Sequence, residues 1–477
     1  MDGCILIKRS KISPAFVAGA AIFACACTRV QEDGPALDTG GPAFVQDTGA
    51  EITIDVPYFD TPKEVTATKD AQETVSAAKE QCGNLLDDDL DGLVDEEGCH
   101  PTPNLRTDLQ WLDLGVVDFP ETVKGPAATR TFGAPAKNTA MVVYAEDLTK
   151  AENKAALWAE TLVTPAGIEV LSPGQWANSY NRAFVGLGHA TLLVGMAPQI
   201  SVVAGPWQVG FTRAYELPLQ YKGSPYKGTI HLGVVQRPPL APNAMGTLDL
   251  DVYCVGGSPM PCAELAKSPQ WQKIVARVNS IWADAHIQLG NVELIDISGD
   301  DGVKLKYLDN VNSAGPDNEF NQVYAATGKL RPKSTAATLV LVAGLLEKGM
   351  PVAAGLSQLA GLPGVPGARA SGLAVVFDEK QWADALKLGP DVSYAADIWG
   401  IIIAHELGHF MGLWHTDEAD GSLHDPIDDT PPCDKKAEVL EPDVCPVQAK
   451  YLMFWRPKGA TVTEGQQKVV RLSPALR

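Results

Sequence analysis

Three histidines and one glutamate stand close together in the segment IIIAHELGHFMGLWH, residues 401–415. His405 and His409 are four residues apart, so on a helix their side chains lie one above the other on the same face. Two imidazoles in this arrangement can occupy two corners of a tetrahedral zinc site, and Glu406 can reach a water in the open metal position. The spacing therefore predicts a catalytic metal site with Glu406 as the general base.

The same segment contains a third candidate ligand. Gly412 allows the backbone to turn sharply, and His415 can then return to the metal. For the short H-E-x-x-H string alone, two histidines buried on an ordinary core helix are an alternative. The longer string H-E-x-x-H-x-x-G-x-x-H would occur by chance in a chain of this length on the order of once in 10^5. The spacing therefore favours a zinc hydrolase.

The residues before the motif predict the helix that presents it. Ile398, Ile401 and Ile402 follow a helical period that continues into the first two histidines. This period places the ligands on the inward face of the helix. Either Asp397 or Ser393 is suited to cap its first turn.

From residue 246 to the end, strands alternate with helices, which predicts an α/β (α+β) domain over 246–477. A helix is expected to begin at Pro269, with Ser268 as its cap. The run 337–346 is apolar throughout and is expected to be a central strand. An edge strand at Gly372–Phe377 is expected to bind substrate by β-augmentation. Further strands are predicted at 246–255 and 286–297.

Residues 106–240 show a different pattern, with short apolar runs separated by Gly, Pro and Asn. This pattern predicts an antiparallel β-sandwich, interpreted as an accessory domain for adhesion, substrate capture or prodomain-like cover. His189 and His231 stand alone in it. They are interpreted as structural residues, as is His286 in the following domain.

The chain has 477 residues and a formal net charge of -20, which argues against nucleic acid as a partner. The charge is unevenly distributed. Residues 31–100 contain 18 Asp or Glu and 3 Lys, so -15 of the -20 lies there. Residues 28–81, rich in Asp, Gly, Pro, Thr and Ala, are predicted to form a disordered acidic linker.

Residues 1–27 have the features of a targeting segment: a basic start, a short apolar run and then small residues and cysteines. The small residue before each cysteine resembles a bacterial lipobox, with Cys25 or Cys27 as the lipid-bearing residue. An ordinary signal peptide is the alternative. The protein is therefore expected to be exported, either as an outer-membrane or cell-surface lipoprotein anchored in the bacterial membrane, or as a secreted protein.

The other cysteines, apart from Cys4, fall into three close pairs, which suggests three local disulfides in an oxidising compartment. Six cysteines allow fifteen connectivities, so pairing between neighbours rests on proximity. The expected pairs are Cys82 with Cys99, Cys254 with Cys262, and Cys433 with Cys445.

The first of these pairs encloses an acidic segment, CGNLLDDDLDGLVDEEGC, over 82–99. Alternating carboxylates before a glycine resemble the start of a calcium-binding loop, although Gly98 occupies the position of the last EF-hand ligand. A solvated acidic run is the alternative. The candidate calcium ligands are Asp87, Asp89, Asp91 and Asp95.

HELGHFMGLWH resembles the extended zinc signature of the metzincin metallopeptidases, and DPIDDTPPC (425–433) resembles their pappalysin (cytophagalysin-like) branch. The resemblance covers about 246–477. It implies Zn²⁺ bound by the three histidines and Met453 as the methionine beneath the metal. Many members have a tyrosine two residues after that methionine, where this sequence has Trp455. Tyr451 lies two residues before Met453.

These features together predict a zinc-dependent endopeptidase that hydrolyses protein or peptide substrates through a zinc-activated water. The alternative is a surface-binding or adhesion lipoprotein with an inactive or subordinate peptidase domain, which Trp455 favours. A third interpretation is a calcium-dependent structural protein. The six acids between Asp417 and Asp429 could support a structural calcium ion or could simply be solvated. The sequence does not specify an oligomeric state.

Overall fold

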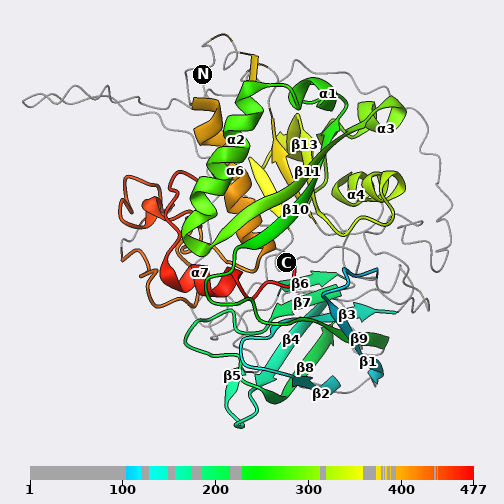
Figure 1. Ribbon diagram of the computed structural model, residues 1–477, viewed down its shortest axis with the longest axis vertical. Coiled ribbons are helices and arrows are strands. Elements are labelled where there is room, and N and C mark those ends of the chain that lie inside the picture. Colours follow the sequence, from blue (N-terminus) through cyan, green and yellow to red (C-terminus); the bar gives the residue numbers. More distant parts are fainter. Residues whose placement is uncertain are drawn as a thin grey trace, which may run out of the picture. The chain divides into compact units, whose positions relative to one another are not determined.

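The computed structural model describes residues 104–119, 128–148, 156–172, 184–187, 189–214, 228–311, 319–357, 372–377, 380, 382–383, 387, 394–434, 437 and 439–477. In this part of the chain the protein is of mixed α+β class (Figure 1). No helix described there is long and apolar enough to cross a bilayer. The predicted targeting segment, acidic linker and calcium loop lie outside the described residues.

The first sheet is an antiparallel path of nine strands in the order β1-β9-β3-β7-β6-β4-β8-β2, with β5 beside β4. One buried cluster includes Phe119 and Phe132, from strands at the two ends of this path. Because β4 also pairs with β6, the strands form one continuous sheet, and the two-layer sandwich stays a prediction. The strands are β1 (Gln110–Phe119), β2 (Ala128–Ala134), β3 (Ala140–Asp147), β4 (Ala156–Val163), β5 (Glu169–Leu171), β6 (Phe184–Leu187), β7 (His189–Leu193), β8 (Gly205–Ala214) and β9 (Gly228–Arg237).

The second sheet has five strands in the order β11-β10-β13-β17-β16, and only the β16–β17 pair is antiparallel. Its central strand is β13, in agreement with the apolar run in the sequence. Successive residues of β13 face opposite sides, so Leu339 and Val340 belong to different buried clusters. The strands are β10 (Gly246–Val255), β11 (Ile287–Ile297), β13 (Ala337–Val342), β16 (Gly355–Ser357) and β17 (Gly372–Val376).

The predicted edge strand is placed wrongly. Its residues form β17, which lies between β13 and β16, so the edge belongs to β16. β16 is only three residues long and comes just before a Gly- and Pro-rich stretch. Such a short strand has no readable period of its own, and its place depends on pairing that is not local in sequence.

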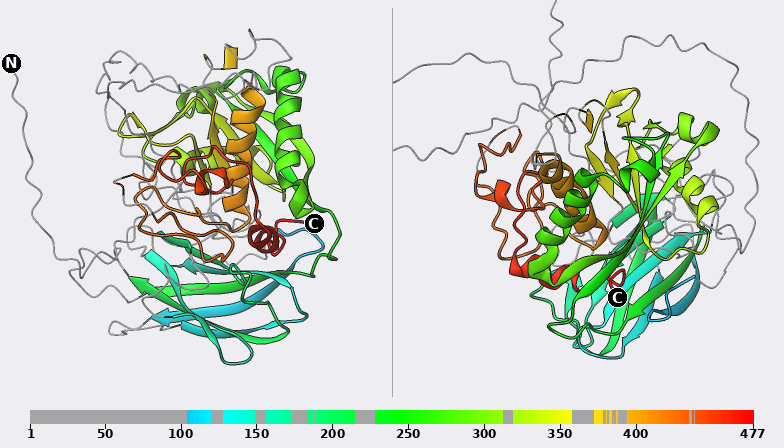
Figure 2. Two further views of the ribbon diagram at one scale, coloured as in Figure 1. Left: turned by 90° about the vertical axis from the view of Figure 1, so that its left-hand side faces the viewer. Right: turned by 45° about the horizontal axis from the view of Figure 1, so that its top comes forward.

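Two helices, α2 (Pro269–Trp282) and α6 (Tyr394–Phe410), pack side by side (Figure 2). Their apolar residues share a buried cluster with one face of the five-stranded sheet, while α4 (Glu319–Leu330) packs on the opposite face. Sheet and helices therefore form three layers, and α6 contacts both the sheet and α2.

The helix starts agree partly with the sequence. α2 begins at Pro269 as predicted, but the Ser268 side chain makes no capping hydrogen bond. α6 begins at Tyr394, so Asp397 lies inside the first turn rather than at the cap position. Ser393, the other candidate, lies outside the described residues.

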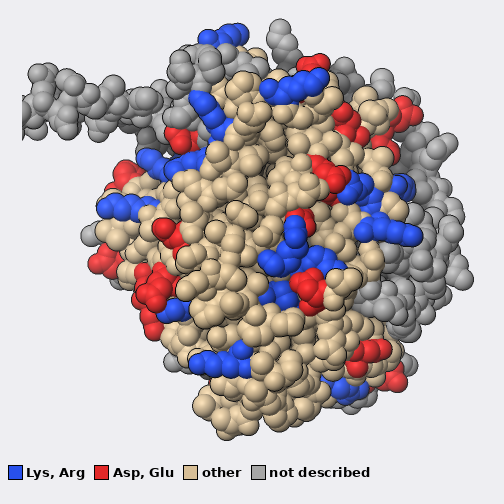
Figure 3. All heavy atoms as spheres, in the orientation of Figure 1, with Lys and Arg blue, Asp and Glu red and all other residues tan. Residues whose placement is uncertain are grey.

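Two of the expected disulfides are present, Cys254–Cys262 and Cys433–Cys445; Cys82–Cys99 lies outside the described residues. On the face shown in Figure 3, basic and acidic side chains are interspersed and no large area carries a single sign. The remaining short elements are α1 (Cys262–Leu265), η2 (Ala283–Ala285), α3 (Gly299–Lys304), β12 (Tyr307–Leu308), β14 (Gly344–Glu347), β15 (Met350–Pro351), η3 (Gln448–Lys450) and α7 (Glu464–Val470).

Candidate metal centre

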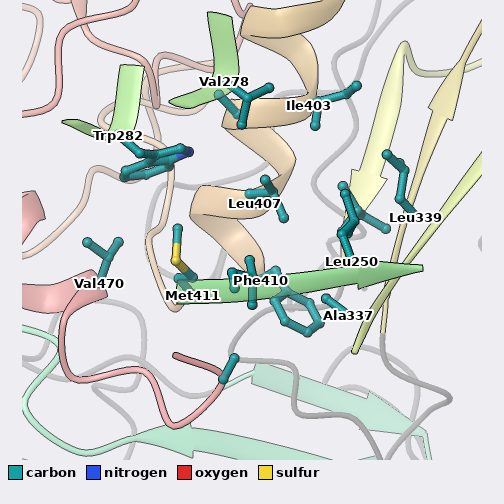
Figure 4. Packing of buried hydrophobic residues seen from close by; sticks show 14 of the residues in the cluster. Leu250, Val278, Trp282, Ala337, Leu339, Ile403, Leu407, Phe410, Met411 and Val470 are labelled. Carbon is teal, nitrogen blue, oxygen red and sulfur yellow. The ribbon is translucent and has the colours of Figure 1, made fainter. Parts of the chain in front are cut away.

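Helix α6 carries the first two histidines and the glutamate of the motif. Its residues Ile403 and Leu407 are buried in the cluster shared with the sheet and α2 (Figure 4). Packing on several sides fixes the axis and rotation of the helix. The side chains that it presents are therefore mounted on a rigid element.

The backbone turns directly after α6. Gly412 has φ +106°, a conformation that L side chains rarely adopt, and its N–H donates to the carbonyl of His409 at 2.8 Å. The N–H of Leu413 donates to the carbonyl of Gly408 at 2.9 Å. This turn brings His415 back alongside the helix.

The three histidines converge. The Nε2 atom of His405 lies 3.1 Å from that of His409 and 3.3 Å from that of His415. One ring nitrogen from each residue lies within 4.8 Å of the others, and all three residues are almost completely buried. The three residues therefore form a group that can bind a metal ion.

The second ring nitrogen of each histidine contacts an oxygen that can only accept a hydrogen bond. A backbone carbonyl can only accept, so Nδ1 of His405 and of His409 donates, and Nε2 is the atom that can bind a metal ion when the ring is neutral. Lone pairs at these separations repel one another unless a cation lies among them. The Nδ1 contacts are His405 to the Leu452 carbonyl (2.6 Å), His409 to the Leu413 carbonyl (2.7 Å) and His415 to the Glu418 carboxylate (2.8 Å).

The donor set fits zinc. Tetrahedral Zn–N bonds of about 2.0–2.1 Å place the ligand nitrogens roughly 3.3 Å apart, close to the 3.1 and 3.3 Å found between the Nε2 atoms. The pKa of His405 is lowered to about 3. Burial is the largest cause, and the electrostatic effect of the neighbouring His415 is the second. His405 is therefore neutral near pH 7, as an imidazole ligand must be.

Glu406 is the buried acid of the site. Neither of its carboxylate oxygens hydrogen bonds to a described residue. Burial raises the pKa of this carboxyl well above its usual value. The carboxyl packs against β16: a Cβ added to Gly355 would lie 2.7 Å from Cγ and 2.8 Å from Cδ of Glu406. Edge strand and acid are therefore in direct contact.

Met453 packs against the motif helix at Gly408. It is fully buried, and a Cβ added to Gly408 would lie 3.2 Å from its Cε and closer still to its sulfur. The carbonyl of Met453 accepts a hydrogen bond from Thr416 N–H at 2.8 Å. The turn at 452–453 thus contacts both the helix and the loop of the third histidine.

Trp455 does not face the three histidines. It is buried in a separate cluster with Leu440 and Phe454, and its indole N–H donates to the Leu440 carbonyl at 2.6 Å. The residue that replaces the tyrosine of many metzincins is therefore part of a local core. The backbone N–H of Tyr451 donates to Gln448 in η3.

The six acids at 417–429 do not converge. No three of the carboxylates in the described part of the chain bring oxygens within 4.8 Å of one another. The calcium interpretation of this segment is therefore not supported, because its acids bind turns of the backbone. Asp417, Asp425 and Asp429 accept from the N–H groups of Cys433, Ile427 and Gly465, respectively.

The lone histidines have structural surroundings. On β9, His231 contacts Asp113 at 2.9 Å and Glu146 at 3.8 Å. His286 lies between η2 and β11 in the left-handed region, with φ +53°. The side chain of His189 is outside the described set, as are the candidate lipidation and calcium residues.

Two contributors to the site were not singled out in the sequence. Glu418 was grouped with the six acids, although its i,i+3 spacing from His415 is a local signal. Gly355 had no signal, because its contact with Glu406 depends on the pairing of β16.

Fold and site together define a mixed α+β protein with a buried three-histidine group that can bind a metal ion. No protein-family model and no curated protein matches the chain.

Among solved structures, the chain is similar to metalloproteinase-II from Bacteroides fragilis, with a TM-score of 0.23 and 15% identity over 41% of this chain and 57% of that one. It is also similar to a family two carbohydrate esterase from Cellvibrio japonicus, with a TM-score of 0.11 and 9% identity over 50% and 80% of the two chains. The chain spans little more than half of the metalloproteinase. At these TM-scores neither similarity defines the fold.

Proposed function

We propose that the protein is a zinc-dependent endopeptidase of metzincin type. The observation that carries this proposal is the convergence of three imidazole ring nitrogens, together with the buried carboxyl of Glu406, which follows His405 on the same helix. Three protein ligands and one open position are typical of catalytic rather than structural zinc sites.

His405, His409 and His415 would hold the zinc ion through Nε2. A zinc ion bound there polarises a peptide carbonyl and makes a water molecule far more acidic than in bulk solvent. The contacts at Nδ1 keep each ring in the tautomer and orientation that this binding needs.

Glu406 carries out the proton transfers. In its ionised form it accepts a proton from the attacking water while the water oxygen bonds to the scissile carbonyl carbon. It then gives that proton to the amide nitrogen as the C–N bond breaks. Burial raises its pKa, which brings the group closer to the range where one residue serves as both base and acid.

β16 is the element that would align the substrate. Among the strands that the structure describes it is the last of its sheet, and it touches Glu406 through Gly355. An extended peptide that adds to this edge gains main-chain hydrogen bonds and has its backbone presented beside the catalytic acid. We therefore assign substrate alignment to β16 and not to Gly372–Phe377.

The alternative of an inactive peptidase domain in a binding lipoprotein depended on Trp455. Its indole N–H donates to the Leu440 carbonyl, so Trp455 belongs to a local core and not to the three-histidine centre. We therefore propose an active enzyme in which Trp455 supplies no oxyanion donor.

Export, the lipid anchor at Cys25 or Cys27, the acidic linker and the calcium loop with Asp87, Asp89, Asp91 and Asp95 form part of the same proposal, supported by the sequence. Assignment to the pappalysin branch rests on the segment 425–433. The β-sandwich interpretation of 106–240 rests on its pattern of short apolar runs.

The proposal is tested with Glu406→Ala. Removing the base should abolish casein cleavage, down to the level of the wild type treated with a zinc chelator, while zinc stays bound because Glu406 is not a ligand. Glu464→Ala, at an exposed position on α7, is the matched control and should cleave as the wild type does. Undiminished cleavage by Glu406→Ala, with a normal zinc content, would refute the proposal.

A further inference from the structure

The loop that carries the third histidine packs against the antiparallel sheet. Met411 and Trp414 share a buried cluster with Leu193, the last residue of β7, and with Met196 just beyond it. Each of these four residues is at most 4% exposed. Met411 lies at the end of α6 in Figure 4, where the cluster continues beyond the helix.

The first contact is at the turn itself. A Cβ added to Gly412 would lie 3.5 Å from Cγ of Leu193 and would overlap its Cδ2. Leu193 therefore fills the space beside the one residue whose left-handed backbone redirects the chain towards His415. Close packing at this point restrains the direction in which the loop leaves the helix.

The second contact is at the residue before the ligand. The indole N–H of Trp414 donates to the sulfur of Met196 at 2.9 Å, and both side chains are buried. Further along the same segments, the Gln199 side chain donates to the carbonyl of Pro426 at 3.2 Å. The end of β7 and the segment that follows it therefore contact the chain on both sides of His415.

His405 and His409 have their relative geometry fixed by one helix, whereas His415 lies on irregular backbone. A ligand on a loop loses conformational freedom when it binds a metal, unless packing has already ordered it. Leu193 and Met196 supply such packing from more than two hundred residues upstream, Trp414 and Met196 being 218 apart.

We propose that Leu193 and Met196 are positioning residues for His415, so that the antiparallel sheet is a working part of the metal centre. The inference rests on the metal site of the proposed function but does not depend on peptide hydrolysis. It assigns the sheet a role other than adhesion, capture or cover.

The test compares two neighbouring leucines of β7 in the full chain. Leu193→Ala removes the contact with Gly412. Leu192→Ala is the matched control, because Leu192 is equally buried on the same strand but belongs to the core of the antiparallel sheet. The measurements are zinc affinity by chelator competition, the visible spectrum of the Co²⁺-substituted protein and the melting temperature of the metal-free protein.

Both variants should lower the melting temperature of the metal-free protein. Leu193→Ala should also weaken zinc binding by roughly 10- to 100-fold, the usual effect of losing a group that orients a ligand, and should change the cobalt spectrum. Leu192→Ala should match the wild type in both metal readouts. If Leu193→Ala does not fold, Met196→Leu should weaken zinc binding, because it removes the sulfur that accepts from Trp414. The volume-conserving Leu193→Met should keep the zinc affinity of the wild type.

Equal zinc affinities and spectra in Leu192→Ala and Leu193→Ala, or in Met196→Leu and the wild type, would overturn the inference and leave the proposed function standing. A wild-type protein that binds neither Zn²⁺ nor Co²⁺ would instead refute the metal site, and the inference with it.

Discussion

If the proposed function holds, Gly355→Ala should slow peptide hydrolysis without removing a catalytic group or a ligand. The added Cβ would lie 2.7 Å from Cγ and 2.8 Å from Cδ of Glu406, whereas ordinary contact begins at 3.4 Å. The carboxyl must therefore move by 0.7 Å or more (3.4 − 2.7). A displacement of about 1 Å in a catalytic group can reduce the rate by about 10²-fold. We expect kcat/KM to fall on the order of 10- to 100-fold, equivalent to about 1.4–2.7 kcal/mol in the activation free energy.

The assay is peptide hydrolysis under kcat/KM conditions, with zinc content and melting temperature measured on the same samples. Gly133→Ala is the control, since Gly133 also lies in a strand and a Cβ there would have no atom within 4 Å. It should keep the wild-type rate. The zinc content of Gly355→Ala should be normal because its contact is with the base and not with a histidine.

A folded, zinc-loaded Gly355→Ala enzyme with a wild-type rate would refute the reasoning. That result would mean that the position of Glu406 against β16 does not matter for turnover. A loss of activity accompanied by loss of zinc would also contradict it, because the substitution would then act through the ligands.

Two further predictions concern other groups. Glu418→Ala should weaken zinc binding by roughly 10- to 100-fold, in line with about 1.5–3 kcal/mol for a hydrogen bond to a charged group. Glu418→Gln keeps an acceptor for Nδ1 of His415 and should lose less zinc affinity. Equal zinc affinities of the two variants in chelator competition would contradict this prediction. Burial lowers the pKa of His231, but hydrogen bonds to Glu146 and Asp113 outweigh it and raise that pKa above its ordinary value of 6.5. A raised folded-state pKa gives stability that is complete below the unfolded pKa and is lost as the pH rises through the folded pKa. The melting temperature should therefore fall more steeply above about pH 6.5 in the wild type than in His231→Gln. Parallel curves of melting temperature against pH for the two proteins would contradict this prediction.

The sequence predicts well the features that depend on local geometry. His405 and His409 share a helical face because four residues make about one turn. The disulfides Cys254–Cys262 and Cys433–Cys445 join cysteines only 8 and 12 residues apart. The first six residues of the apolar run at 337–346 form β13, the central strand of its sheet, whereas 344–346 belong to β14 in the three-stranded sheet.

The sequence predicts poorly what depends on pairing between distant segments. The strand predicted to be at the edge, β17, has a further neighbour, β16, whose three residues show no period. The direction of the Trp455 side chain could not be predicted from its position two residues after Met453. In an irregular turn, a shift of one residue decides whether a side chain faces the metal centre or the local core. The six acids share a composition, but four of them, Asp417, Glu418, Asp425 and Asp429, each have a different backbone or ring partner.

Three of the four members of the motif are held by segments that the motif does not contain, whereas His409 contacts the Leu413 carbonyl inside it. His405 is oriented by the carbonyl of Leu452, 47 residues away, and Glu406 rests on β16. The loop of His415 rests on Met196, 218 residues from Trp414. The eleven-residue string therefore specifies which atoms can meet a metal, while their rigidity comes from both sheets. A division of the chain at 240–246 separates antiparallel from parallel strands, but one buried cluster crosses it. The effect of a substitution on metal binding should therefore depend on whether the residue belongs to that cluster and not on its distance from the motif in the sequence. Packing, and not sequence proximity, limits the movement of a side chain.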